Sequence, residues 1–418
     1  MEEGQEGRTQ VEAGLTPHQR PESLRLAGWG VAALAVALVH NRLWATPNLA
    51  FFTAISKNLG HNPFGHGFDG DYLLTNLTGP TLARVLGQTD PHQYARLHLA
   101  LLLVGMVAVV VGAFRRFGYS VARLLCVLIA ASPALTVTME WLGQPDAITL
   151  PLALGVVIAR RRTVAFALAV LVGLTHAEQG VIIALVATAV RLVVDDDLDA
   201  NPIRHRVSIE LAALLGGVIV GRGITELYLR LNDIVITTPR TSFLDLGVSG
   251  FVDHHLKSHG VIVYALWGPL WIGIAVAAVR FVRSGASWAP ELRRDWTLLG
   301  TAALADVVPM LITLDETRVY SLTTAPLLVG AAVLSRRTLD QTDTARLTGI
   351  TGTSAAVAVG TLAVALAVAP GLFTAGETYL SYDLHPREFA RFLVDGRHPG
   401  DLTQWLLGPF GFEVPVTK

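Results

Sequence analysis

The feature of this chain that most constrains its fold is a series of long apolar runs separated by short polar segments. Hydrophobic residues fill 52% of its 418 positions and charged residues only 16%, whereas a soluble domain carries about 25% charged residues. Its mean hydropathy is +0.49. Most runs are long enough to cross a hydrocarbon core of roughly 30 Å as helices. We therefore expect an all-α, polytopic helical bundle with about eleven transmembrane helices, at 24–43, 96–114, 119–138, 147–159, 163–175, 179–194, 207–228, 260–280, 296–314, 319–335 and 349–371.

Arginine gives these runs an orientation. It gathers in every second gap, at Arg115-Arg116, Arg160-Arg161-Arg162, Arg204 and Arg206, Arg280 and Arg283, Arg293-Arg294 and Arg336-Arg337. Loops rich in arginine stay on the cytoplasmic side of a membrane. The amino terminus is then cytoplasmic and the carboxyl-terminal tail extracytoplasmic in a multi-pass protein of the plasma membrane.

The chain then divides into a first tail, a transmembrane domain with two long outer loops, and a second tail. Residues 1–23 form a disordered cytoplasmic tail without the order of a cleaved signal peptide, and 24–371 form the transmembrane domain. Two outer loops, 44–95 and 229–259, are long, and 372–418 is an outer tail. Apolar residues at helical spacing indicate interfacial helices at 47–58 and 80–87 and an amphipathic helix at 386–394. The single cysteine, Cys126, excludes an intrachain disulfide.

Acidic and histidine residues gather in the other set of gaps. Asp69 and Asp71 lie in a glycine-rich turn of the first outer loop. Glycine lets the backbone turn sharply, so two carboxylates can approach one ligand and one can act as a general base. The alternative is a solvated turn with ordinary turn aspartates.

Three more gaps on this side carry candidate binding residues. Glu140 and Asp146 flank one hairpin, where Asp146 is also placed to cap the next helix. His176 and Glu178 interrupt two apolar runs and can orient a phosphate and a sugar, or form only a polar turn. Arg318 is the one cation of the short outer gaps and suits a phosphate, or pairs with an acid to join two helices.

Glu316 and His254 are further candidates for substrate binding. His254 lies in the Asp253-His254-His255 group of the second long loop. Asp306, inside an apolar run, is expected to face another helix. Arg222 and Glu226, four residues apart, are expected to form a structural ion pair.

The spacing of these groups matches no structural zinc site. His61, His66, Asp69 and Asp71 form one cluster and Asp253, His254 and His255 another. We expect no tightly bound metal and no firmly implied cofactor, and a weakly held divalent cation, Mg or Mn, on a lipid phosphate stays open. Nothing in the chain indicates a nucleic-acid partner.

The layout resembles integral-membrane glycosyltransferases of the GT-C superfamily. Asp69 and Asp71, Gln144-Pro145-Asp146, His176 with Glu178, and Arg318 carry the resemblance. It implies transfer of a sugar from a polyprenyl-phosphate carrier to a lipid, glycan or protein acceptor at the extracytoplasmic face. In this sequence Asp69 comes some 25 residues after the first apolar run. In the family, the acidic residue usually follows the first helix within a few residues.

The resemblance also implies an inverting displacement at the sugar. Asp69 or Asp71 would be the base, Arg318 and His176 would stabilise the leaving phosphate, and Glu140, Asp146 and Glu178 would bind sugar hydroxyls. The apolar helices and the membrane lipids would hold the prenyl chain.

Other functions stay open at the level of sequence. One is a lipid-linked glycan ligase or polymerase that uses the 229–259 loop with Arg240, His254 and His255. Another is a transporter or flippase of an anionic lipid or sugar, which should place ionisable groups near the bilayer midplane. A third is a non-catalytic assembly or receptor role. Abundant alanine, valine and arginine with little lysine suggest a bacterial cell-envelope protein.

Overall fold

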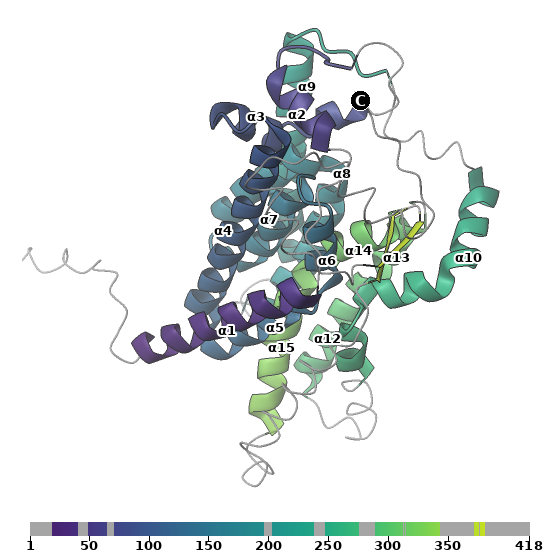
Figure 1. The fold of residues 1–418 in the computed structure, drawn as a ribbon. Coiled ribbons are helices and arrows are strands. Elements are labelled where there is room, and N and C mark those ends of the chain that lie inside the picture. The colour runs from purple at the N-terminus through teal and green to yellow at the C-terminus, as the bar shows by residue number, and fades with distance from the viewer. Residues whose placement is uncertain are drawn as a thin grey trace, which may run out of the picture.

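The protein is a bundle of α-helices with one short β-hairpin (Figure 1). The structure is a computed structural model, and it describes residues 19–40, 49–64, 71–195, 203–237, 247–275, 289–311, 313, 315–342, 372–375 and 377–380. The helical class expected from the sequence is therefore confirmed. The apolar run at 349–371 and the amphipathic segment at 386–394 lie outside the described residues.

Four helices form the centre of the bundle: α4 (Pro91–Phe117), α7 (Asp146–Ile158), α8 (Arg162–Val194) and α9 (Ile203–Leu231). Within the described part of the chain, α4, α8 and most of α9 are long and apolar enough to cross a membrane. The number rises to five if each of two bent helix pairs is one span. The expected count of eleven spans stays a prediction.

Helix α8 is a hairpin of two arms that reverses at His176. A straight helix would separate Arg162 from Arg191 by about 43 Å, at 1.5 Å per residue. Instead Arg162 Nε lies 2.5 Å from Glu210 Oε1, and Arg191 Nε lies 2.7 Å from Glu210 Oε2. His176 has extended backbone torsions, φ −156° and ψ 79°. The sequence-based division into two runs at 163–175 and 179–194 therefore describes this segment correctly.

Proline divides other apolar runs that the sequence analysis treated as continuous. Helix α5 (Tyr119–Ala130) bends by 53° into α6 (Pro133–Glu140), and α14 (Glu316–Thr324) bends by 49° into α15 (Pro326–Thr342). Proline lacks a backbone N–H and cannot continue the helical hydrogen bonds. Ser132 caps α6, because its Oγ accepts from the Ala134 N–H at 3.1 Å.

The run at 296–314 is also divided. Helix α12 (Pro290–Ala305) ends at Asp306, and the single-turn helix α13 (Val307–Met310) follows. Asp306 Oδ2 accepts a hydrogen bond from Thr323 Oγ1 of α14 at 2.5 Å. Asp306 thus faces another helix, as expected.

The first long loop forms a folded cap over one end of the bundle. It contains α2 (Leu49–Lys57), the 3₁₀ helix η1 (Asp71–Thr75) and α3 (Thr78–Val85). Both helices expected in this loop are therefore present, and their place at a membrane interface stays a prediction. Phe52, Leu74, Tyr94 and Leu142 belong to one apolar cluster that joins this cap to α4 and to the turn before α7. The Tyr228 hydroxyl of α9 donates to the Leu59 carbonyl and ties the cap to the end of α9.

The remaining elements lie around this centre. Helix α1 (Gln19–His40) packs against α5, and it begins before the expected start at residue 24. Helix α10 (Gly247–Trp267) includes residues expected to lie in the 229–259 loop, so the His254 cluster lies on a helix and not in a loop. This part of that expectation is wrong because the polar residues at 253–259 follow helical turns. Strands β1 (Leu372–Ala375) and β2 (Glu377–Leu380) pair antiparallel, and β1 contacts α10 and α14.

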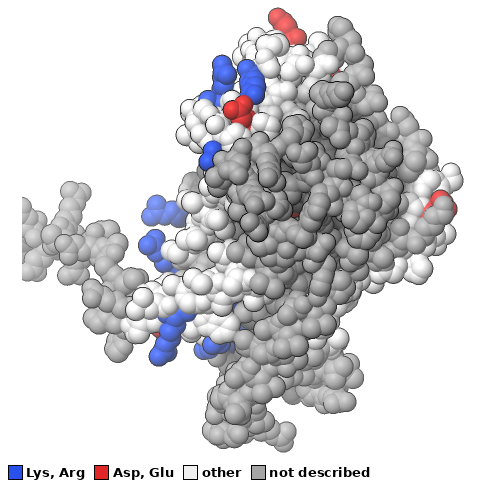
Figure 2. Space-filling view, viewed as in Figure 1, with Lys and Arg blue, Asp and Glu red and all other residues white. Residues whose placement is uncertain are grey.

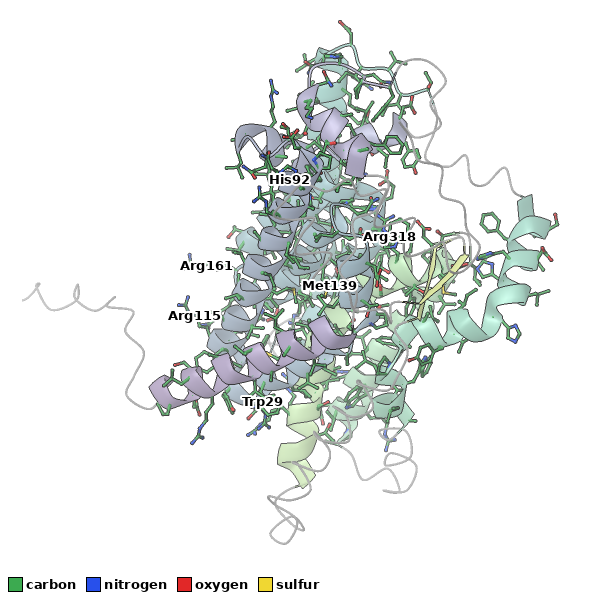
Figure 3. All side chains as sticks on the ribbon, viewed as in Figure 1. Trp29, His92, Arg115, Met139, Arg161 and Arg318 are labelled. Atoms are coloured by element: carbon green, nitrogen blue, oxygen red, sulfur yellow. The ribbon has the colours of Figure 1, made fainter. Side chains whose placement is uncertain are left out.

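The two ends of the bundle differ in charge. At one end Arg116, Arg162 and Arg191 bind the last carbonyls of α7 or the carboxylates near α8 and α9. At the other end lies the folded cap, and the start of α7 there holds Arg318 through Asp146. In Figure 3 Arg318 lies at the right of the bundle and Arg115 and Arg161 at its left. The face in Figure 2 has basic side chains along its left margin and broad uncharged areas elsewhere in its described part. We name the end with Arg116, Arg162 and Arg191 the arginine end, and the end with the folded cap the cap end.

Candidate functional site

The candidate site at the cap end is built around an ion pair between Arg318 and Asp146. Arg318 Nε lies 2.5 Å from Asp146 Oδ2, and Nη2 lies 3.1 Å from Oδ1. Asp146 is fully buried, and the Arg318 side chain is 9% exposed. The pair joins the start of α7 to α14 across 172 residues of sequence. Asp146 therefore orients Arg318, a role that the sequence analysis gave only as an alternative.

Arg318 keeps donor capacity beyond this pair. A guanidinium has five N–H donors, and only Nε and Nη2 donate to Asp146. Its Nη1 reaches Asp315 Oδ2 at the long distance of 3.5 Å. The Arg318 Cζ lies 5.5 Å from the centroid of the Trp141 ring, which covers one side of the cation.

Two buried donors in the turn that leads to Asp146 have no acceptor among the described residues. They are Trp141 Nε1 and Gln144 Nε2, both in the turn between α6 and α7. Gly143 fixes this turn, because its φ of +98° suits glycine. A Cβ added at this position would lie 2.5 Å from Leu49 Cδ1. A buried N–H without an acceptor costs about 1–3 kcal/mol, which a bound anion would recover.

A second polar pair lies where α10 meets α14. His254 Nε2 lies 2.6 Å from Glu316 Oε1, and His255 Nε2 lies 3.6 Å from the same oxygen. Glu316 is fully buried, and both histidines are half-buried. An ionised carboxylate only accepts hydrogen bonds, so His254 Nε2 is the donor in its contact with Glu316. This is the arrangement of an imidazole oriented by an acid.

Asp71 is buried and already bonded. Its Oδ2 accepts from the Thr237 backbone N–H at 2.5 Å and from Thr237 Oγ1 at 2.6 Å. Asp71 therefore ties the cap to the segment after α9. The neighbouring Tyr72 interacts electrostatically with Arg318, which brings η1 to the Arg318 pair. Asp69 and His66 lie outside the described residues.

His176 and Glu178 belong to a separate cluster with α9. His176 Nδ1 lies 3.7 Å from Glu178 Oε2, and Glu178 Oε1 lies 3.6 Å from Arg222 Nη1. Arg222 also pairs with Glu226 at 2.5 Å, as expected from the sequence. Glu140 is 1% exposed and ends α6 next to Trp141.

The described residues contain no group of three histidine, cysteine or carboxylate side chains arranged to hold a metal ion. The weak divalent cation of the sequence analysis therefore stays a hypothesis.

The arrangement suits anion binding next to a proton acceptor. Arg318, Trp141 and Gln144 offer N–H donors, and the carboxylates of Asp71 and Glu316 are acceptors nearby along η1 and α14. Sequence reasoning missed Trp141, Gln144 as a donor, and Tyr72. The available signal was that Trp141 and Gln144 share one short polar gap with Glu140 and Asp146.

No family model matches the chain, and no curated protein matches it significantly. Two solved structures are similar. One is ArnT from Cupriavidus metallidurans in the apo state, with 15% identity, a TM-score of 0.38 and coverage of 77% of this chain and 62% of that one. The other is the archaeal oligosaccharyltransferase AglB from Archaeoglobus fulgidus in complex with an inhibitory peptide and a dolichol-phosphate. It has 13% identity, a TM-score of 0.40 and coverage of 83% of this chain and 55% of that one.

The chain spans less than two thirds of the length of either of these proteins. Similarity at this level carries no weight for activity.

Proposed function

We propose that the chain is a multi-pass membrane glycosyltransferase. It takes a sugar from a polyprenyl-phosphate carrier and transfers it, with inversion, to a lipid, glycan or protein acceptor at the extracytoplasmic face of a bacterial plasma membrane. The cap end holds the reaction, and the apolar helices hold the prenyl chain.

The observation that carries this proposal is the set of donors around Arg318. Among the described residues, Trp141 Nε1 and Gln144 Nε2 lack acceptors, and Arg318 Nη1 has only a long contact. A phosphate offers acceptors alone and carries the negative charge that a buried guanidinium favours. The leaving group of such a transfer is a lipid phosphate, so donors fixed before reaction would stabilise its developing charge.

The base belongs to the first loop in this proposal. Asp71 already accepts two hydrogen bonds through Oδ2, which makes that oxygen a weaker proton acceptor. We therefore assign Asp69 as the base and Asp71 as the residue that holds the turn. Glu140, Glu178 and Glu316 serve as candidates for binding sugar hydroxyls, and His176 for stabilising the phosphate.

Sugar transfer from a radiolabelled polyprenyl-phosphate sugar by the protein in lipid nanodiscs tests the proposal. Asp69→Asn and Arg318→Gln should each abolish measurable transfer while the protein remains folded. Asp90→Asn is a matched control, because the exposed Asp90 carboxylate pairs with Lys57 and has no assigned role in the reaction. Full transfer by Asp69→Asn and Arg318→Gln would contradict the proposal, and vectorial uptake without a transfer product would indicate a transporter.

One specific observation favours a second candidate, a ligase or polymerase of lipid-linked glycans. His254 Nε2 lies 2.6 Å from the buried Glu316 carboxylate, and an imidazole oriented by an acid in this way suits general-base work. If His254→Ala loses transfer while Asp69→Asn and Asp71→Asn retain it, α10 supplies the base and this candidate replaces the first.

A further inference from the structure

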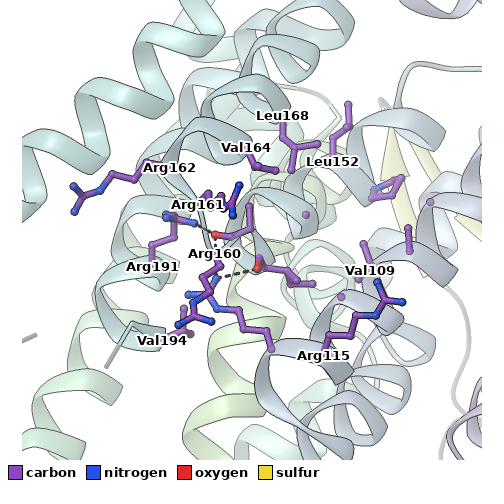
Figure 4. A pocket seen from close by; sticks show the side chains of 18 of the residues that line it. Val109, Arg115, Leu152, Arg160, Arg161, Arg162, Val164, Leu168, Arg191 and Val194 are labelled. Atoms are coloured by element: carbon purple, nitrogen blue, oxygen red, sulfur yellow. Dashed lines mark hydrogen bonds between the residues drawn. The ribbon is translucent and has the colours of Figure 1, made fainter. Parts of the chain in front are cut away.

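A groove at the arginine end combines an apolar wall with a ring of positive charge (Figure 4). It lies along α4, α7 and α8, and its volume is about 1460 Å³. Seven arginines line it against two carboxylates. The arginines are Arg115, Arg116, Arg160, Arg161, Arg162, Arg191 and Arg206, and the carboxylates are Asp195 and Glu210.

Both carboxylates already form ion pairs with arginines of the groove. Asp195 pairs with Arg116, and Glu210 pairs with both Arg162 and Arg191. Among the described residues, Arg115, Arg160 and Arg161 have no ion-pair or hydrogen-bond partner, and all three are exposed. The groove thus carries positive charge that the described protein does not neutralise.

Arg206 marks a binding position inside this groove. It is only 7% exposed, and its Nη1 has no hydrogen-bond partner among the described residues. Asp195 interacts with Arg206 electrostatically, without an ion pair or a hydrogen bond between the two described side chains. A buried guanidinium N–H without an acceptor is costly, and an anion in the groove would supply one.

The wall of the groove has the length and exposure that an acyl chain requires. It follows α4 from Leu101 to Arg115, which is about 21 Å at 1.5 Å per residue. One leaflet of a hydrocarbon core is about 15 Å deep. Val104 and Val164 line the groove and are 69% and 46% exposed, so its wall is open on the side where lipid would lie.

We propose that this groove binds an anionic membrane lipid from the leaflet at the arginine end, separately from the sugar-transfer site. The phosphate group lies among Arg115, Arg160, Arg161 and Arg206, and one acyl chain follows the wall between α4 and α7. Guanidinium groups bind phosphate oxygens through paired hydrogen bonds, and basic groups near a membrane attract anionic lipid by about 1 kcal/mol each. A free phosphate would leave the apolar wall unused.

Native mass spectrometry of the full chain tests this site with phosphatidylglycerol, phosphatidylcholine and inorganic phosphate as separate probes. The wild type should bind phosphatidylglycerol at least about tenfold more tightly than phosphatidylcholine. Arg160→Gln with Arg161→Gln should weaken the anionic lipid roughly 30-fold, since two basic groups are removed. Arg206→Gln should also weaken it.

Arg293→Gln with Arg336→Gln is the matched control, because both residues lie outside the groove, and it should leave binding unchanged. Equal affinity for the two lipids would overturn the proposal, as would unchanged binding in the Arg160/Arg161 variant. Inorganic phosphate binding as tightly as the lipid would overturn the role of the acyl chain. No sugar transfer enters this measurement, so its outcome is independent of the proposed reaction.

Discussion

At the scale of single residues, the Arg318–Asp146 pair has two roles that mutation can separate. Removing one member of a buried ion pair leaves an uncompensated charge and costs about 3–5 kcal/mol, whereas apolar replacement of both is often neutral. Asp146→Asn or Arg318→Gln alone should therefore lower the free energy of unfolding, measured by thermal unfolding in detergent.

The double variant Asp146→Leu with Arg318→Met should recover most of that stability yet show no sugar transfer. If it recovered transfer together with stability, Arg318 would only join α7 to α14, and the anion-binding role would be wrong. Comparison of the single and double variants is a double-mutant cycle, which is informative because the two side chains contact each other directly.

Trp141 allows a test without a loss of packing. Trp141→Phe keeps an aromatic ring against Arg318 and removes the Nε1–H that has no acceptor. Loss of an unsatisfied donor should not reduce stability. The KM for the polyprenyl-phosphate donor should rise about tenfold, as for a lost hydrogen bond to a charged group, and an unchanged KM would exclude Trp141 from phosphate binding.

At the scale of elements, close contact between α8 and α9 depends on glycine. A Cβ on Gly221 would lie 2.3 Å from the Val170 carbonyl oxygen and 2.7 Å from the Leu174 nitrogen, which are backbone atoms. Gly221→Ala should therefore destabilise the protein by about 2 kcal/mol, as measured by thermal unfolding.

Gly223, two residues along the same helix, is the matched control. It is exposed, and its added Cβ would meet nothing within 4 Å. Gly223→Ala should be neutral or stabilise by up to about 1 kcal/mol, because alanine favours helix. Equal effects of the two substitutions would argue against this packing of α8 on α9.

Sequence alone predicted the elements whose pattern is local. Apolar runs located the helices, helical spacing located α2 and α3, and i,i+4 spacing located the Arg222–Glu226 pair. Pro133 and Pro326 were available signals for the bends at α6 and α15, yet the runs containing them were treated as straight. Asp146–Arg318 and His254–Glu316 could not be predicted as pairs, because tertiary packing joins residues 172 and 62 positions apart.

At the scale of the whole molecule, the fold separates two kinds of polar chemistry. Reversal of α8 at His176 carries Arg162 and Arg191 to one end and His176 with Glu178 to the other. Helices α4 and α7 run parallel, because Gly105 packs against Pro151 and Gly112 packs against Ile158. Arg116, near the end of α4, therefore lies at the opposite end of the bundle from the Trp141 turn, which precedes α7. With a membrane between these ends, the proposed sugar donor and the proposed anionic lipid bind at opposite faces.

This division makes a topological prediction. In a background where Cys126 is replaced by alanine, single cysteines at His61 and Glu178 should react with an impermeant maleimide applied to intact cells. Cysteines at Arg115 and Arg161 should react only after the membrane is permeabilised, since arginine-rich segments remain cytoplasmic. His61 and Arg161 are exposed, so access to the reagent depends on the side of the membrane and not on burial. Labelling of residues 61 and 161 from the same side would contradict the bundle orientation and, with it, the placement of sugar transfer and lipid binding on opposite faces.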